Sequence, residues 1–332
     1  MRVRWLTPDK PENVSVGRRR IAEHLGRAGI DVTLRGTTPR TVLESFRERS
    51  AYDALVGTTR AGAIAGAALA TRTGTPLVVD HVDPIRQFGA THPRPLALAV
   101  RLAENAAFAL AAHVLYVYPE EEPRVRRYAP RATRTNLGVE YERFAEPDPG
   151  AIERARERLD REGVPADSRV LVYVGGLKPL YHVRELLAAI DHLAGWTLLV
   201  LGAGSLEEPV GEAASERGDV VFLGTVPHED VPGYLHAADA GACLVDDPHT
   251  LKLLEYAAAG LPAVQLRGRA EARLGDLVAY CGPDPADVAR ATRRAARSDD
   301  EDVAALRAFA RRHRWRAIAE TYERAVRSVT DH

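Results

Sequence analysis

One short stretch of the sequence combines a cation and an acid at a spacing that suits a binding site. Lys252 precedes Glu255 by three positions, so on a helix the two side chains lie on nearly one face. A cation in the first helical turn opposes the helix dipole, and a bound phosphate would offset that cost. The alternative is a surface ion pair worth about 0.3–0.5 kcal/mol. Lysine is otherwise rare in the chain and occurs only at Lys10, Lys178 and Lys252.

Three glycine turns, each after an apolar run, precede this stretch. They read Val172-Tyr-Val-Gly-Gly-Leu177, Leu199-Val-Leu-Gly-Ala-Gly204 and Phe222-Leu-Gly-Thr-Val226. Glycine lets the backbone approach a phosphate closely, although each turn alone is also an ordinary strand-to-helix connection. The second lacks the third glycine of a dinucleotide fingerprint, which disfavours a nicotinamide cofactor. The candidates for binding a phosphorylated ligand are Gly175, Gly176, Gly202, Gly204, Thr225 and Val226.

Strands and helices alternate along the chain and would position these turns. Apolar runs at 3–6, 77–79, 114–117, 169–174, 197–201 and 240–245 are continuous, which is typical of a parallel sheet covered on both faces. Helices are expected at 17–28, 95–112, 250–259 and from 300 to the end, and a further strand at 134–137. The 332 residues indicate two α/β domains, with Pro147-Asp-Pro-Gly150 between them. The predicted boundaries are 1–148, 149–310 and a final helix at 311–332.

Charge is distributed unevenly. The first 135 residues carry 21 Lys and Arg against 13 Asp and Glu, whereas the remainder carries 24 against 33. The net charge of −1 gives no case for nucleic acid as a partner. The basic half would suit phosphates or an anionic membrane surface, or it is simply a solvated arginine-rich surface. The two cysteines make no disulfide framework, and no signal peptide or membrane span is evident, so we expect a cytoplasmic protein.

Taken together, the motifs resemble the GT-B glycosyltransferases, and specifically the retaining family 4. The resemblance is strongest over 172–265 and includes Leu235-His-Ala-Ala-Asp239 and Leu251-Lys-Leu-Leu-Glu-Tyr-Ala-Ala-Ala-Gly-Leu-Pro262. It extends to Asn13–Leu25 and to Asn136-Leu-Gly-Val-Glu-Tyr-Glu-Arg-Phe144 in the first half. It implies two doubly wound Rossmann-like domains facing across a cleft. The first would bind the acceptor and the second a nucleotide-sugar donor, and the final helix would cross back to the first domain.

The resemblance also implies roles for the acidic residues of the opening stretch. Family members have two glutamates separated by seven intervening residues, and the second matches Glu255, which would hold the ribose hydroxyls. The first falls on Asp247, which keeps the charge on a shorter side chain and would approach the donor sugar. Lys252 would lie near the donor phosphates, and Leu251 begins the nucleotide-binding segment.

The chain departs from the family where two cations usually contact the diphosphate. Those positions are Gly176 and Tyr181 here. Lys178 and Arg184 are the candidates for the missing charge, since a leaving phosphate needs a cation in the transition state. Alternatively, the donor carries a single phosphate.

Candidates in the first half follow the resemblance. Val78-Val-Asp-His-Val-Asp83 places His81 where the family has a histidine near the reacting sugar, with Asp83 to orient it. The alternative, which has equal weight, is that His81 has a purely structural role. The acceptor-binding candidates are Gly17, Arg18 and Arg19 at the expected start of the first helix, and Arg60.

The expected activity is transfer of a sugar to a glycan or lipid-linked acceptor, with retention and without metal or other cofactor. A peripheral contact with the inner face of a membrane is also expected. Two alternatives are a GT-B nucleotide-sugar 2-epimerase and a non-catalytic nucleotide- or glycan-binding subunit.

Overall fold

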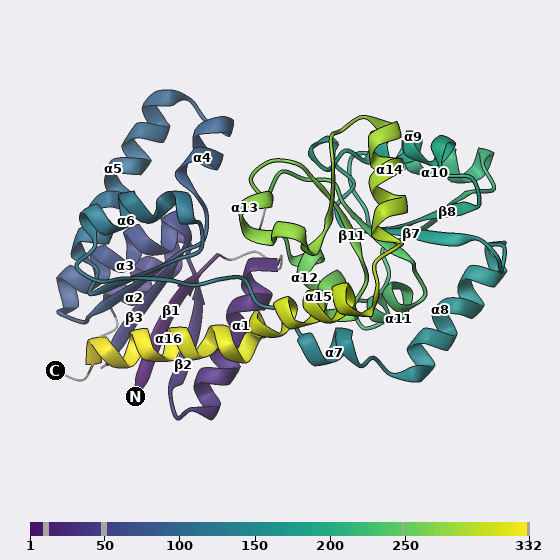
Figure 1. Cartoon of the computed structure of the whole chain (residues 1–332). Coiled ribbons are helices and arrows are strands. Elements are labelled where there is room, and N and C mark those ends of the chain that lie inside the picture. Colours follow the sequence, from purple (N-terminus) through teal and green to yellow (C-terminus); the bar gives the residue numbers. More distant parts are fainter. Residues whose placement is uncertain (9–12, 48–51, 248, 331–332) are drawn as a thin grey trace. The chain divides into compact units, whose positions relative to one another are not determined.

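The computed structural model describes residues 1–8, 13–47, 52–247 and 249–330. The chain divides into two compact units, which are described separately (Figure 1). The first comprises Met1–Gly138 together with the segment that begins at Trp315, and the second comprises Val139–Arg314. The divisions therefore fall at 138/139 and 314/315, compared with the expected 148/149 and 310/311.

The first unit is built on a parallel sheet of six strands in the order β2-β1-β3-β4-β5-β6. Most of these strands are short, continuously buried runs, as the sequence predicted. The strands are β1 Arg2–Thr7, β2 Asp31–Gly36, β3 Ala54–Thr58, β4 Leu77–His81, β5 His113–Tyr116 and β6 Ala132–Arg134. The helices are α1 Asn13–Arg27, α2 Pro39–Arg47, α3 Thr59–Thr73, α4 Ile85–Thr91, α5 Arg94–Leu110, α6 Glu122–Tyr128 and α16 Trp315–Thr330.

Two apolar clusters cover the faces of this sheet. One joins α1 and α16 to strands β1 and β3, and the other joins α3 and α5 to β4 and β5. Trp5 of β1 stacks on Tyr322 of α16 with their ring centroids 5.6 Å apart. Helix α16, yellow in Figure 1, lies beside α1 although nearly 300 residues separate them in sequence. The last helix is therefore part of the core of the first unit.

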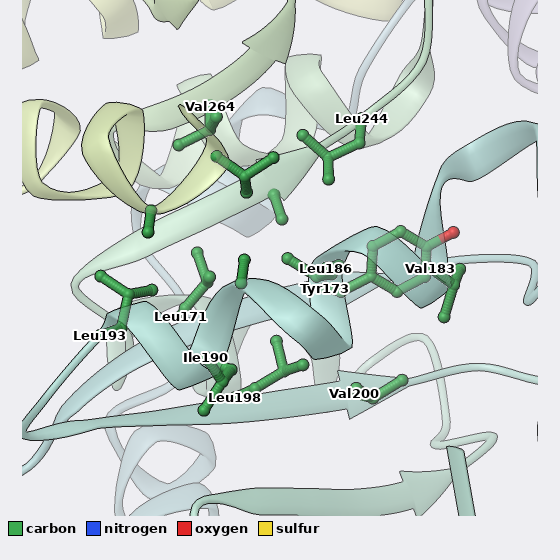
Figure 2. Packing of buried hydrophobic residues seen from close by; sticks show 14 of the residues in the cluster. Leu171, Tyr173, Val183, Leu186, Ile190, Leu193, Leu198, Val200, Leu244 and Val264 are labelled. Atoms are coloured by element: carbon green, nitrogen blue, oxygen red, sulfur yellow. The ribbon is translucent and has the colours of Figure 1, made fainter. Parts of the chain in front are cut away.

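The second unit repeats the architecture with the strand order β12-β11-β10-β7-β8-β9, again parallel. The strands are β7 Arg169–Val174, β8 Trp196–Leu201, β9 Val220–Gly224, β10 Ala240–Cys243, β11 Ala263–Leu266 and β12 Ala279–Cys281. The helices are α7 Tyr141–Ala145, α8 Pro149–Arg161, α9 Val183–Ala189, α10 Glu207–Glu216, α11 Val231–His236, α12 Leu251–Ala259, α13 Glu271–Leu274, α14 Pro285–Ala295 and α15 Asp300–Arg312. Figure 2 shows Val183 and Leu186 of α9 packed with the strand residues Leu171, Tyr173 and Leu198.

Three expected elements differ in the structure. Helix α1 begins at Asn13 rather than Gly17, so the expected helix start lies one turn inside the helix. Strand β6 covers Ala132–Arg134 instead of 134–137. The helix expected from Asp300 to the end is two helices, α15 and α16, because the backbone leaves the helix at His313 and Arg314 pairs with Val139. Within the described part of the chain, no helix is long and apolar enough to cross a membrane.

Candidate functional site

The second sheet has a topological switch point between β7 and β10. The chain continues from β7 to β8 on one side and from β10 to β11 on the other. In open parallel sheets, ligands bind beyond the carboxyl ends of the strands at such a point. Strand β7 ends at Val174 and leads into Gly175 and Gly176, while β10 leads through Asp247 into α12. The structure therefore brings the first and last motifs of the sequence analysis together.

Tyr256 of α12 joins these two strands. Its hydroxyl accepts a hydrogen bond from the Val174 amide at 3.0 Å and donates one to the Ala242 carbonyl at 3.3 Å. Gly241 of β10 leaves room for the ring, because a Cβ there would lie 2.6 Å from a ring carbon. Sequence analysis did not single out Tyr256. The glycine inside a buried strand was the available signal, since it often marks a close approach by another group.

Lys252 lies in the first turn of α12 with its ammonium between two aromatic rings. Nζ is 4.1 Å from the ring centroid of Tyr173 and 4.6 Å from that of Tyr181. Nζ is buried, and no described residue gives it a hydrogen bond or an ion pair. Burial lowers the pKa of Lys252, partly offset by the nearby Cys243 and Glu255. A desolvated ammonium that lacks an anionic partner is costly, and an incoming anion would remove that cost.

The glycines of the first two turns shape the space around Lys252. Gly175 has a φ of 141°, and a Cβ on it would lie 2.9 Å from Nζ of Lys252. Gly202 has a φ of 144°, and its Cβ would meet the Gly175 carbonyl oxygen. Gly204 similarly abuts the backbone of Leu177. Gly202 and Gly204 therefore support the loop after β7, and their direct contact with a nucleotide stays a prediction.

The start of α12 is open to an anion. Thr250 is the N-cap residue, yet its side chain does not cap the helix, and its hydroxyl lies 3.3 Å from Sγ of Cys243. The first amide groups of α12 therefore have no side-chain acceptor among the described residues. The Asp247 carboxylate accepts the His249 amide at 2.9 Å. Burial and the charge of Asp247 raise the pKa of Tyr181.

Glu255 is one turn further along α12 and meets the loop after β9. Its Oε1 is 3.3 Å from Nε2 of His228, and its side chain is 18% exposed. The hydrogen bond to Glu255 raises the pKa of His228, against the opposing effect of burial. Arg143 donates to the other ring nitrogen at 3.2 Å. His228 follows Thr225, which is exposed, and Val226, which is half-buried. The predicted loop therefore contacts Glu255 through His228, a residue that sequence analysis did not select.

The other cations proposed for the phosphate lie outside this arrangement. Lys178 and Arg184 are both exposed, and Gly176 lies beside the ring of Tyr181. Leu251, the first residue of α12, is half-buried. Of the cations that sequence analysis proposed for the phosphate, Lys252 is therefore the one whose charge is enclosed at the switch point.

His81 lies in the first unit at the end of β4 and is 2% exposed. Its Nδ1 is 3.3 Å from Glu104 and its Nε2 is 3.1 Å from Glu121, and both carboxylates also pair with Arg124. Burial opposes protonation, but the two carboxylates outweigh it and raise the pKa of His81. The ring is held by these glutamates and not by Asp83, which faces Arg60 at 4.0 Å. An acid isolated in an alanine- and leucine-rich helix was the sequence signal for Glu104.

Two of the acceptor candidates, Gly17 and Arg18, pack inside the first unit. A Cβ at Gly17 would lie 2.7 Å from Trp315 of α16, so this glycine is a packing site. Arg18 is buried and donates to Asp80 at 2.7 Å and to the Tyr322 hydroxyl at 3.1 Å. Their expected place at the helix start is wrong because α1 begins earlier. Arg60 donates to the carbonyl groups of Asp83 and Pro84, whereas Arg19 is exposed.

Solved structures with the same architecture include glycosyltransferases. HepE from Anabaena, solved with UDP and glucose, is 18% identical with a TM-score of 0.75, over 99% of this chain and 100% of that one. Sucrose-phosphate synthase from Thermosynechococcus elongatus is 17% identical with a TM-score of 0.76, over 99% of both chains. WaaG, a glycosyltransferase involved in lipopolysaccharide biosynthesis, is 15% identical with a TM-score of 0.70, over 98% of this chain and 99% of that one.

Among curated proteins, no sequence matches this chain. Residues 168–298 match the family model described as glycosyl transferases group 1. This segment lies within the second unit and contains the switch point with Lys252 and Glu255. The chain therefore has the α/β fold of the GT-B glycosyltransferases, and its second unit contains the segment that matches the group 1 glycosyl transferase model.

Proposed function

We propose that this protein is a retaining glycosyltransferase that moves a sugar from a nucleotide-activated donor to an acceptor hydroxyl. The observation that carries the proposal is the enclosed ammonium of Lys252, which has no anionic partner among the described residues and lies at the switch point. The group 1 match over the same segment supports the reaction class.

The donor phosphate would occupy the space bounded by Lys252, the open start of α12 and the backbone at Gly175. Glu255 would accept hydrogen bonds from the ribose hydroxyls, and its contact with His228 would then rearrange or be shared. HepE has been solved with UDP and with UDP-glucose, which favours a nucleotide-sugar donor of this class. The acceptor would be a glycan or lipid-linked hydroxyl.

In the reaction, the bond between the anomeric carbon and the phosphate oxygen breaks and its electron pair leaves with the phosphate. The acceptor oxygen bonds to the anomeric carbon, and the hydroxyl proton passes to the leaving phosphate oxygen. Negative charge therefore grows on the phosphate oxygen, where a cation held in a partly dry site is most effective. Lys252 would supply that charge. Asp247, shortly before α12 in the chain, would approach the sugar and favour positive charge at the anomeric carbon.

A ligand-binding experiment tests the donor site. Thermal shifts should be measured with UDP, UDP-glucose and other nucleotides, since a ligand at 100 times its Kd stabilises by about 2.7 kcal/mol. We expect Lys252→Met to lose most of that shift and to lower kcat by about 100-fold. Lys178→Met removes an exposed lysine that lies outside the enclosed arrangement and serves as the matched control. The proposal fails if no nucleotide shifts the wild-type protein, or if both variants lose the shift equally. Anomeric configuration of the product, read by NMR, tests retention.

The lowered pKa of Lys252 gives a pH prediction. Above that pKa the free protein holds a neutral amine, and phosphate binding restores the ammonium, so binding takes up a proton. Affinity should therefore fall as pH rises through the Lys252 pKa. Titration calorimetry in buffers of different ionisation enthalpy measures the uptake. Proton uptake that persists in Lys252→Met would contradict the assignment.

A further inference from the structure

One oxygen of the Glu255 carboxylate is already engaged within the second unit. Oε1 lies 3.3 Å from Nε2 of His228, whereas no described residue lies within hydrogen-bond distance of Oε2. The Glu255 side chain is 18% exposed, so a ligand can reach the carboxylate. His228 therefore leaves one acceptor oxygen of Glu255 for a group outside the protein.

The His228 ring is held from α7 as well as from α12. Arg143 donates to Nδ1 at 3.2 Å, and Arg143 is itself paired with Glu140 at 2.7 Å. The buried ring of Phe144 meets the imidazole edge to face, with the centroids 5.7 Å apart. Because a guanidinium can only donate, Nδ1 must supply a lone pair, and the proton of the neutral ring lies on Nε2. The neutral ring is therefore a fixed donor to Oε1 of Glu255.

This arrangement differs from an ordinary surface ion pair. Two exposed side chains that are free to move gain little from pairing. Here the ring is 55% exposed, yet both of its nitrogens have a partner, and the partners lie 27 and 85 positions away in the chain. The orientation of the Glu255 carboxylate is thus set from a second loop and a second helix of the unit.

The charge of the ring depends on groups from three elements. They are Glu255 of α12, Glu140 and Arg143 at α7, and Glu229 and Asp230, which follow His228 in its own loop. The hydrogen bond to Glu255 raises the pKa of His228, against burial and the charge of Arg143. Protonation would set a second N–H against the Arg143 donor, so the charged ring would keep Glu255 and lose Arg143.

We propose that His228 is a positioning residue for Glu255, which holds Oε1 so that Oε2 accepts from the donor ribose, and that loss of its proton strengthens this contact. The role rests on the proposed function, in which Glu255 meets the ribose hydroxyls. Beside a neutral ring, Glu255 keeps its full negative charge, and hydrogen bonds to a charged group are the stronger ones. An imidazolium would neutralise the carboxylate and make it a weaker acceptor.

This proposal gives the ribose contact a defined pH dependence. A ribose that shares Glu255 weakens the interaction that raises the pKa of His228, so binding lowers that pKa. The ribose contribution to affinity should therefore be weaker below the ordinary value of 6.5 and stronger above the raised value. The effect is opposite in sign to that of Lys252, for which affinity falls as pH rises.

The ratio of the dissociation constants of 2′,3′-dideoxy-UDP and UDP isolates the ribose contact. Both ligands carry the same base and phosphates, so the effects of Lys252 and of the phosphate charge cancel in the ratio. Calorimetric titration of the full-length protein from about pH 5.5 to about pH 8.5 should give a ratio that rises from about threefold to about tenfold. If the nucleotide screen selects another base, the corresponding pair of that base is used.

Two substitutions of His228 separate positioning from structural support. His228→Gln keeps an amide N–H for Oε1 but cannot titrate, so the ratio should stay at about tenfold at every pH. His228→Leu removes the donor, and the ratio should stay at about threefold throughout because Glu255 is no longer held. His192→Gln is the matched control, since His192 is an exposed histidine of the same unit, and it should keep the wild-type pH profile.

A merely structural role would lower the melting temperature of His228→Leu and leave the ratio at its wild-type values, which would overturn the proposal. The proposal is also overturned if the wild-type ratio does not change with pH, or if His228→Gln keeps the pH dependence. Failure of every nucleotide to bind would overturn the proposed function as well. Binding of UDP with a flat ratio would overturn the role of His228 alone.

Discussion

At the scale of single residues, two buried cations differ in what surrounds them. His81 has a carboxylate at each ring nitrogen, and Arg124 completes a balanced cluster of two acids and two bases. Lys252 has aromatic rings and no acid within ion-pair distance among the described residues. A satisfied cluster is typical of structure, whereas an enclosed charge without a partner indicates a ligand. This contrast favours Lys252 over His81 as a group that meets substrate.

Glu121→Gln should therefore destabilise the protein without abolishing nucleotide binding at the proposed donor site. The contacts with His81 and Arg124 lower the pKa of Glu121 to about 2 despite burial, and its ordinary value is 4.5. The depressed pKa contributes stability that is present above 4.5 and is lost as pH falls toward 2. The raised pKa of His81 contributes stability that is complete below 6.5 and is lost as pH rises through the raised value.

Urea unfolding as a function of pH measures this contribution. At pH 6 we expect Glu121→Gln to cost about 3 kcal/mol, because it leaves buried charge unbalanced, and to flatten the acid limb of the stability curve. Glu44→Gln breaks an exposed pair with Arg40 and should change nothing measurable. An unchanged acid limb in Glu121→Gln would show that this cluster does not govern the acid stability.

At the scale of elements, the local pattern predicted most strands and the glycine turns, since apolar continuity and glycine act within a few residues. Tyr256, Glu104 and Glu121 were not predicted, because their roles depend on partners 14 to 82 positions away. The break between α15 and α16 was also missed, since the bridge from Arg314 to Val139 is a long-range contact. The sequence thus predicts helices and strands better than the side-chain contacts that connect them.

Gly202 is the described glycine at which a side chain would be least tolerated. Its φ of 144° suits few side chains, and a Cβ would overlap the Gly175 carbonyl. Gly202→Ala should therefore cost about 3 kcal/mol or more and displace the loop beside Lys252. Gly218→Ala is the control, because a Cβ there meets nothing within 4 Å. Denaturant unfolding compares the two, and equal losses would mean that the contact between the two loops does not decide stability.

At the scale of the whole molecule, the first unit is completed only when the chain returns through α16. Trp315 packs where Gly17 and Gly138 leave room for its ring. The Tyr322 hydroxyl donates to Asp80 at 2.7 Å, and Asp80 also accepts from Arg18 and Thr58. This buried network joins α16, α1 and two strands of the sheet. The local sequence pattern could not show this network, because Tyr322 and Asp80 lie more than 240 positions apart.

Replacing one buried tyrosine in each unit should show whether each unit depends on its own hydrogen-bond network. Tyr322→Phe leaves an oxygen of Asp80 without its donor and should destabilise the first unit by about 1–3 kcal/mol. Tyr256→Phe leaves the Val174 amide without its acceptor and should do the same to the second unit. Hydrogen exchange followed by mass spectrometry resolves the two effects by segment.

We expect Tyr322→Phe to speed exchange in β1, β3 and β4, and Tyr256→Phe to speed it in β7 and β10. Each change should leave the other unit at wild-type rates, because the networks of the two tyrosines share no residue. If Tyr322→Phe opened β7 and β10 as readily as β4, the two units would unfold together. In that case α16 would stabilise the whole chain rather than the first sheet alone.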